Sequence, residues 1–316
     1  MTLDSIRQAR ERLASYLEPT PLVCSAPLSR ATGRRVWLKL ETQQPTGSFK
    51  VRPALNGALA RRDEAARSGV LTSSSGNFAQ AVAYAARELG FDATIVMMSS
   101  SSPYKIAGTE ALGAKVVLCG DSFDERWETT YRLQRETGRL LLHPYDSEDT
   151  IAGDGTLGLE LLDQLDGEFT VVVPVSGGGL ISGVASAVKQ ARPACRVVGV
   201  QPERNGALVR SLEAGRPINV GPVRTIADAL VASTPGERTF ALIRQYVDQV
   251  VNVTEEEIAA AVRDLAMKQK LVVEPGGSVA VAALLAGKVE GTGDVVCVAS
   301  GGNLTPQTLS GLLGVG

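Results

Sequence analysis

The chain has 316 residues, of which 44% are hydrophobic and 21% charged, and its formal net charge is −2. This balance argues against a nucleic-acid-binding protein, which needs a basic face to neutralise phosphates, and no stretch reaches the ~18 apolar residues of a membrane span. At about 100–200 residues per domain, the length predicts two domains or one large α/β unit. The N-terminal segment has no apolar signal-peptide core and the four cysteines form no CxxC pair, so we expect a cytoplasmic protein with free thiols.

Short β-branched runs alternate along the chain with longer amphipathic stretches. The candidate strands, in chain order, are VWLKL (36–40), GVLTSS (69–74), ATIVMM (93–98), KVVLC (115–119), RLLLH (139–143), TVVVPV (170–175), RVVGVQ (196–201), QVVNV (249–253) and DVVCVAS (294–300). The candidate helices include 77–90, 122–138, 254–270 and 275–287. Many strands are apolar throughout, which is typical of parallel strands buried on both faces. The βαβα order therefore predicts an α/β fold of doubly wound, open twisted and mostly parallel sheets with right-handed crossovers.

Four segments rich in small residues stand where a strand should end and a helix begin, which is where open α/β sheets bind ligands. They are PTGSFK (45–50), TSSSGN (72–77), VPVSGGGLISG (173–183) and VASGGN (298–303). In the third, SGGG follows a strong strand, so backbone N–H groups and a helix start can converge on a phosphate. The Rossmann G-x-G-x-x-G and the P-loop pattern both fail here. The segment therefore indicates a phosphate cup for another kind of ligand, or a plain tight turn.

Lys50 ends the first of these segments. A lysine after a turn is commonly a solvated side chain, but beside a phosphate cup it gains a second interpretation. An amine held in a site, with its pKa lowered by its neighbours, can form a Schiff base with a carbonyl. A carbonyl cofactor that also carries a phosphate is pyridoxal phosphate. The hydroxyls and N–H groups of TSSSGN suit a carboxylate, although such a cluster can also be a simple helix cap.

Together these pieces resemble the fold-type II pyridoxal-phosphate enzymes, in the branch of threonine/serine dehydratases and serine racemase. The matching pieces run in family order over nearly the whole chain: EPTPL (18–22), KLETQQPTGSFKVR (39–52), SSGN (74–77), HP (143–144), IAGDGT (151–156), VPVSGGGLISG (173–183), TIAD (225–228), VEP (273–275) and SGGN (300–303). The resemblance implies the two-domain fold of the tryptophan synthase β subunit. Residues 1–68 and 147–316 would form a large cofactor-binding domain, and residues 69–146 a small substrate-side domain.

The same resemblance implies a role for each matched residue. Lys50 would hold the cofactor as a Schiff base and later take the α-proton of the substrate, while Ser75 would act on the opposite face. The other cofactor-binding residues would be Phe49 beside the ring, Asn77 at its hydroxyl, Ser300 at its nitrogen, Glu274, and the phosphate-binding Ser176, Gly177, Gly178 and Gly179. The substrate would contact Ser74, Ser75, Gly76, Asn77, Phe78, Arg126 and Tyr145.

Two observations argue against an essential metal ion. The chain has one histidine, His143, so a site of several histidines is excluded, and a cap at a strand end is its simplest interpretation. At the cation site of the racemase-like branch, the resemblance aligns Gln201 and Ala207 with the family's carboxylates. Without them a divalent cation has little oxygen charge to bind, although Glu203 nearby leaves a weak site open.

The implied function is a pyridoxal-phosphate-dependent ammonia-lyase, or dehydratase, which converts a β-hydroxy amino acid to a 2-keto acid and ammonia by α,β-elimination. Serine or threonine is the default substrate. Phe78, where the family usually has histidine, and Tyr145 favour a bulkier substrate such as phenylserine, whereas Arg126 favours an acidic one such as threo-3-hydroxyaspartate. The resemblance also implies a homodimer, and the end of the chain soon after SGGN implies no regulatory domain.

Other functions remain open at this point. On the same scaffold, the chain could be an amino-acid racemase or a β-replacement enzyme. A nicotinamide-dependent dehydrogenase is disfavoured by the missing G-x-G-x-x-G. A non-catalytic small-molecule binder, with Lys50 idle, is the remaining possibility.

Overall fold

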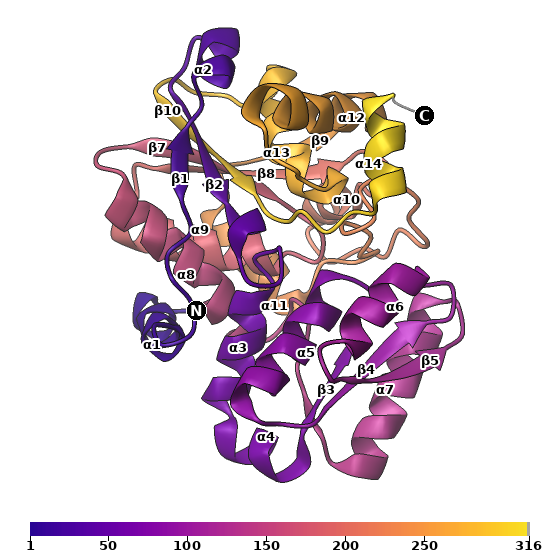
Figure 1. Ribbon diagram of the computed structural model, residues 1–316. Helices are drawn as coiled ribbons and strands as arrows, with labels where there is room; N and C mark the ends of the chain where they lie inside the picture. Colours follow the sequence, from indigo (N-terminus) through magenta and orange to yellow (C-terminus); the bar gives the residue numbers. More distant parts are fainter. Residues whose placement is uncertain (315–316) are drawn as a thin grey trace.

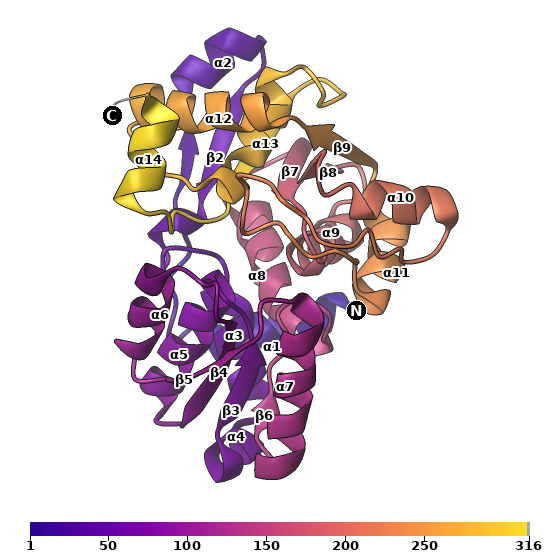
Figure 2. The same cartoon turned by 90° about the vertical axis from the view of Figure 1, so that its right-hand side faces the viewer.

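The computed structural model describes residues 1–314 and contains two sheets with helices packed on them. The larger sheet has the strand order β1-β2-β10-β7-β8-β9 and the smaller has β5-β4-β3-β6. In both views the smaller sheet and its helices form the lower lobe, below the larger sheet (Figures 1 and 2). Every strand pairing is parallel except that of β1 with β2. The predicted α/β class with mostly parallel sheets is therefore confirmed.

The strands of the larger sheet come from both ends of the chain, and those of the smaller sheet from the segment between them. The strands are β1 (Leu22–Cys24), β2 (Val36–Leu40), β3 (Val70–Ser73), β4 (Ala93–Met98), β5 (Lys115–Cys119), β6 (Leu140–Leu141), β7 (Phe169–Pro174), β8 (Arg196–Pro202), β9 (Gln249–Val253) and β10 (Asp294–Ala299). The domain boundaries given above stay a prediction.

The helices connect these strands. They are α1 (Leu3–Leu13), α2 (Ala26–Thr32), α3 (Val51–Ala60), α4 (Arg62–Ser68), α5 (Asn77–Leu89), α6 (Pro103–Glu110), α7 (Phe123–Thr137), α8 (Glu148–Gln164), α9 (Gly179–Ala191), α10 (Ala207–Ala214), α11 (Glu237–Tyr246), α12 (Glu255–Asp264), α13 (Pro275–Leu285) and α14 (Pro306–Leu313), with short turns η1 (Glu41–Gln43) and η2 (Leu265–Gln269). None of the helices in residues 1–314 is both long and apolar enough to cross a membrane.

Local chemistry explains most element ends. Gly90 and Gly138 end α5 and α7 in the left-handed conformation, as predicted from their positions. Thr254 caps α12 through a reciprocal bond with Glu257. The predicted helix 254–270 is observed as α12 continued by the π-helical turn η2, and it ends at Lys270, whose φ of 61° is left-handed. Such turns interrupt the regular spacing on which a sequence pattern depends.

Two helices of the larger lobe approach each other unusually closely. A Cβ on Gly183 of α9 would overlap the backbone of Gly155 and Ile151 in α8, and one on Gly158 would lie 2.8 Å from Ala187. Only glycine permits this spacing, because any side chain would push the helices apart. As a result the middle of α8 lies against α9, from Asp154 beside Gly179 to Gly158 beside Ala187.

Candidate active site

A cavity of about 630 Å³ lies where the segments following strands of the two lobes face each other. All the predicted site residues line it: Phe49, Lys50, Ser74, Ser75, Gly76, Asn77, Phe78, Arg126, Tyr145, Ser176, Gly177, Gly178, Gly179, Glu274 and Ser300. The carboxyl ends of parallel strands lie at one edge of a sheet. This is why segments distant in sequence come together here.

Lys50 lies at the start of α3, and its Nζ donates a hydrogen bond to the carbonyl oxygen of Pro144 at 2.6 Å. The Nζ also lies 4.9 Å from the ring of Phe49 and 5.3 Å from that of Phe78. Burial lowers the pKa of Lys50, and Asp154 partly opposes this effect. A lowered pKa increases the share of neutral amine, the form that acts as nucleophile or base.

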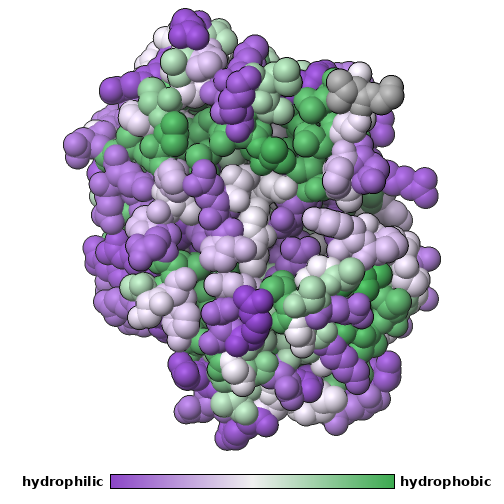
Figure 3. Space-filling model, in the orientation of Figure 1, coloured by the Kyte–Doolittle hydropathy of each residue, from purple (hydrophilic) through white to green (hydrophobic). Residues whose placement is uncertain are grey.

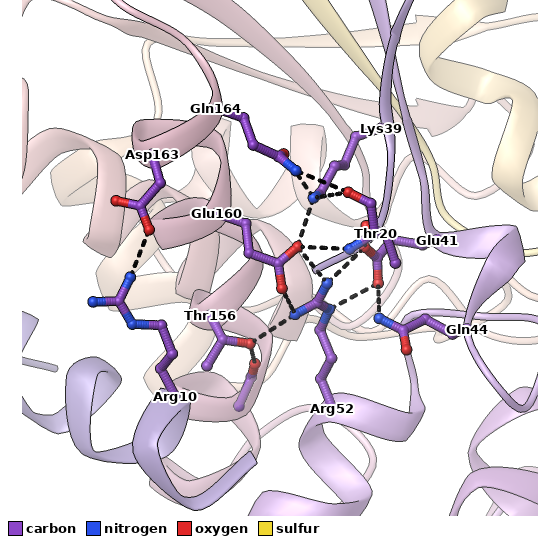
Figure 4. A network of polar contacts seen from close by, with 11 residues as sticks. Arg10, Thr20, Lys39, Glu41, Gln44, Arg52, Thr156, Glu160, Asp163 and Gln164 are labelled. Carbon is purple, nitrogen blue, oxygen red and sulfur yellow. Dashed lines mark hydrogen bonds and ion pairs between the residues drawn. The ribbon is translucent and has the colours of Figure 1, made fainter. Parts of the chain in front are cut away.

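A buried network of charged side chains holds the segment that carries Lys50 (Figure 4). Arg52 donates to both oxygens of Glu41, at 2.8 and 2.9 Å, and to both oxygens of Glu160, at 2.6 and 2.9 Å. Lys39 donates to Glu160 at 2.5 Å. Burial would lower the pKa of Arg52, but Glu41 and Glu160 raise it above its ordinary value. The network balances two cations with two carboxylates and fixes the first turn of α3.

The predicted phosphate cup is the turn between β7 and α9. Gly178 has φ 98°, a conformation that favours glycine, and a Cβ on Gly177 would overlap the ring of Tyr145. The first N–H groups of α9 have no partner within the helix, and within residues 1–314 no bond from the N–H groups of residues 177–180 is found. Thr239 fixes the turn by donating its hydroxyl to the Gly177 carbonyl at 2.7 Å. Free donors at a helix start are a suitable site for an anion.

Asn77 begins α5 and is oriented from two sides. Its Nδ2 donates to Glu274 Oε1 at 2.6 Å, and its Oδ1 accepts from Asn303 Nδ2 at 2.9 Å. Asn303 also donates to the carbonyl of Thr46 at 2.8 Å. Burial raises the pKa of Glu274 to about 7, although the bond from Asn77 opposes this.

Arg126 reaches the cavity from α7 and is buried. Its Nε donates to Ser73 Oγ at 2.9 Å, and its Nη1 to Ser75 Oγ at 3.4 Å. Ser75 Oγ also accepts from the Met98 N–H at 3.1 Å. Burial lowers the pKa of Arg126. Within the described part of the chain no carboxylate pairs with this guanidinium.

His143 caps the backbone, as its position predicted. Its Nδ1 accepts hydrogen bonds from the N–H groups of Asp146 at 2.8 Å and Tyr145 at 3.3 Å. Burial lowers the pKa of His143 to about 4, so the ring is neutral at physiological pH. Its ring stacks on Trp127, with centroids 4.9 Å apart, and meets Tyr145 edge-on at 4.7 Å. The rings of Trp127, His143 and Tyr145 therefore form a continuous stack from α7 of the smaller lobe to Gly177 in the phosphate cup.

Three residues near the cavity were missed from the sequence. Asn303 orients Asn77, Thr239 fixes the cup, and Asp154 lies fully buried beside it. The SGGN and IAGDGT segments contain two of them, but only contacts between distant elements reveal their positions.

The cavity fits pyridoxal phosphate. A glycine cup with free N–H groups, which a Cβ on Gly177 would distort, can take the phosphate. Lys50 offers an amine of lowered pKa for the carbonyl. No three histidine, cysteine, aspartate or glutamate side chains converge as metal ligands in residues 1–314, and the absence of an essential metal stays a prediction.

Comparisons with known proteins agree with this fit. The family model described as pyridoxal-phosphate dependent enzyme matches residues 13–301. L-threonine ammonia-lyase of Thermotoga maritima is 42% identical over 317 residues, covering 100% of this chain and 79% of that protein. The threonine deaminase of T.th. superposes with a TM-score of 0.92 at 43% identity, covering 96% of this chain and 99% of that one. Maize serine racemase gives a TM-score of 0.94 at 36% identity, with 98% and 95% covered.

Proposed function

The chain belongs to the pyridoxal-phosphate-dependent enzymes, and from this membership we propose that it is an ammonia-lyase acting on β-hydroxy amino acids, with serine or threonine as substrate. The products are a 2-keto acid and ammonia. One observation carries the proposal: the Lys50 amine, with its lowered pKa, lies in the same cavity as a phosphate cup and a serine-rich helix start. Relatives of about 40% identity named for this activity support it.

When bound, the cofactor supplies a carbonyl for the substrate amine and an electron-withdrawing ring that acidifies the substrate's α-proton. Residues 177–180 would hold its phosphate through backbone N–H groups. Asn77, fixed by Glu274 and Asn303, would hold the ring. Ser300 would supply a neutral hydroxyl to the ring nitrogen, which would then carry no proton.

Lys50 is the base in this scheme. Its neutral Nζ accepts the α-proton, and the resulting ammonium keeps the Pro144 carbonyl as a hydrogen-bond acceptor. The rings of Phe49 and Phe78 lie 4.9 and 5.3 Å from the amine, and its burial favours the neutral form. The N–H groups of Ser75 and Asn77 donate to no acceptor among residues 1–314, and they would bind the substrate's carboxylate at the start of α5, where the helix dipole attracts an anion.

The test is a keto-acid and ammonia assay on the purified protein with pyridoxal phosphate. We expect keto acid from L-serine or L-threonine, unchanged by a chelator. Lys50→Ala and Lys50→Arg should both reduce the rate by at least about 10²–10⁴-fold, because neither provides a base. Lys189→Ala serves as the control, because Lys189 does not line the cavity and contacts Asp248 and the carbonyls of Pro193 and Cys195 instead. Turnover that survives Lys50→Ala would contradict the proposal.

Arg126 favours a second candidate, threo-3-hydroxyaspartate dehydratase. Among residues 1–314, this buried guanidinium donates hydrogen bonds only to serine hydroxyls, so it has unused capacity for a carboxylate, which it binds in bidentate geometry. A substrate with a side-chain carboxylate would supply that partner. If Arg126→Lys reduces turnover of this substrate far more than turnover of serine, the acidic substrate is the better assignment.

Ser75 supports a racemase activity as the alternative on the same scaffold. Two donors, Met98 N–H and Arg126, bond its oxygen, and such donors stabilise the deprotonated form of a hydroxyl. Chiral analysis of unreacted serine separates the two activities, because racemisation yields D-serine without keto acid.

We also propose a cytoplasmic homodimer. The four cysteines are free thiols, which suits a reducing compartment. Val23, Met267 and Val272 are large exposed hydrophobic residues, and hydrophobic side chains form a band across the upper part of the face in Figure 3. Light scattering coupled to size-exclusion chromatography tests the dimer, with Met267→Lys expected to weaken it.

A further inference from the structure

Asp154 is a buried acid that the mechanism above does not use. It lies in the middle of α8 with 0% of its surface exposed. Among residues 1–314, no group donates a hydrogen bond to either of its carboxyl oxygens. A buried carboxylate without donors is strongly unfavourable, so this side chain needs a proton or a cationic partner.

The carboxyl group lies directly behind the phosphate cup. A Cβ on Gly179, the first residue of α9, would lie 2.8 Å from Asp154 Oδ2, and Gly179 itself lines the cavity. The glycine-mediated contact of α8 with α9 makes this approach possible. The start of α9 therefore faces the cavity on one side and Asp154 on the other, and its partial positive charge attracts an anion from both.

The charged groups that face Asp154 are Lys50, Arg52 and Glu41. Arg52 is already paired with Glu41 and Glu160, and Lys39 completes this set of two cations and two carboxylates. Lys50 donates to the carbonyl of Pro144 and forms no ion pair with any residue of the described range 1–314. Its amine is also the group that the cofactor engages. Asp154 thus has no permanent counter-charge.

We propose that Asp154 takes up a proton when a phosphate group enters the cup, so that this end of α9 holds one anion instead of two. The inference rests on the proposed function, in which the cup binds the phosphate of pyridoxal phosphate. Burial raises the pKa of Asp154 to about 7, with Lys50 and Arg52 opposing the rise. Proton uptake is therefore readily available near neutral pH.

Thermodynamic linkage makes this proton uptake measurable as a pH dependence of cofactor binding. If binding requires the protonated acid, the dissociation constant of the cofactor rises by up to about tenfold for each pH unit above the pKa of Asp154, and this contribution is absent below it. Other groups of cofactor and protein also titrate, Glu274 among them, since burial raises its pKa to about 7 as well. The informative quantity is therefore the difference between the wild type and a variant that cannot titrate at position 154.

The experiment is equilibrium dialysis of the holoenzyme against pyridoxal phosphate between about pH 6 and pH 9. Asp154→Asn removes the titration, and Asp154→Ser, smaller and also neutral, replaces it if the first variant fails to fold. Asp149→Asn is the matched control, because Asp149 lies on the same helix and faces Arg12 and Arg61 instead.

We expect Asp154→Asn to bind the cofactor more tightly than the wild type at the alkaline end, with a slope lower by up to about one decade per pH unit. Asp149→Asn should follow the wild type. Identical slopes in Asp154→Asn and wild type would overturn the inference while leaving the proposed function intact. A wild type that binds no pyridoxal phosphate at any pH would overturn the proposed function, and the inference with it.

Discussion

Replacing Arg52 with methionine should destabilise the protein strongly, because it isolates a buried carboxylate. Without Arg52, Glu160 keeps Lys39 at 2.5 Å, but Glu41 keeps only the Thr20 hydroxyl at 2.6 Å and the Gln44 amide at 3.2 Å. Removing one partner of a buried ion pair costs about 3–5 kcal/mol. We expect a loss of this size in the free energy of unfolding at neutral pH.

The loss should shrink in acid. In the wild type, burial alone would raise the pKa of Glu41. The opposite effect of Arg52 is larger, so the pKa lies below its ordinary value. Glu41 therefore contributes stability above the unfolded-state pKa, and this contribution is lost as pH falls through the folded-state value. In Arg52→Met burial acts without Arg52, so Glu41 takes a proton more readily and the variant approaches the wild type as pH falls.

Urea unfolding followed by circular dichroism, with Trp37 and Trp127 as fluorescent reporters in the two lobes, measures the effect. Arg10→Met is the matched control, since Arg10 pairs with Asp163 on the surface (Figure 4), at 2.8 Å with both side chains largely exposed. Such a pair contributes at most about 1 kcal/mol. If Arg52→Met destabilises no more than Arg10→Met, the network does not hold α3 and this reasoning is wrong.

Three further predictions concern the cavity. In Gly177→Ala the new methyl group pushes against the ring of Tyr145, and the strain costs about 1–3 kcal/mol. The dissociation constant of pyridoxal phosphate should therefore rise about 5- to 150-fold. Adding Tyr145→Ala should restore part of the affinity, and no restoration would exclude the clash as the cause. Asn303→Ala removes one hydrogen bond to the Asn77 amide, and the loss of this bond costs about 1 kcal/mol. Cofactor binding should therefore weaken about fivefold in the same dialysis; unchanged binding would show that Asn303 does not orient Asn77. The pKa of His143 falls from an ordinary 6.5 to about 4 through burial, so the unfolded chain binds more protons between these values and stability should decline as pH falls from 6.5 to 4; His143→Gln should flatten this part of the urea-midpoint profile, and an unaltered profile would contradict the assignment.

The strand ends could be predicted because they depend on local pattern. Apolar runs such as residues 170–175 are long enough to identify, and the glycine-rich turn after them follows directly. The short strand β1 was missed because only three residues pair, with Val23 and Cys24 exposed. Its antiparallel pairing with β2 depends on backbone contacts between Leu22–Cys24 and Trp37–Lys39. Such contacts leave no periodic pattern of apolar residues in the sequence.

The site residues divide in the same way. Lys50 and the phosphate cup lie in short motifs, PTGSFK and SGGG, that can be identified from the sequence alone. Asn303 and Thr239 reach the site through hydrogen bonds to residues 226 and 62 positions away. A polar residue at such a position has no pattern of its own, because its role depends on which distant element the fold brings to it.

The buried charges of the larger lobe form two groups with different consequences. Lys39, Glu41, Arg52 and Glu160 satisfy one another through paired bonds, so removing any one leaves a defined deficit and the set acts as a rigid support. Lys50 has no ion pair within the described chain, and burial shifts its pKa towards the neutral form. A group whose charge is left uncompensated is one that can change protonation state during a reaction. Arg52 of this network follows Lys50 by two residues. The balanced network therefore fixes the backbone that carries Lys50, whose amine has no paired charge and can change its protonation state.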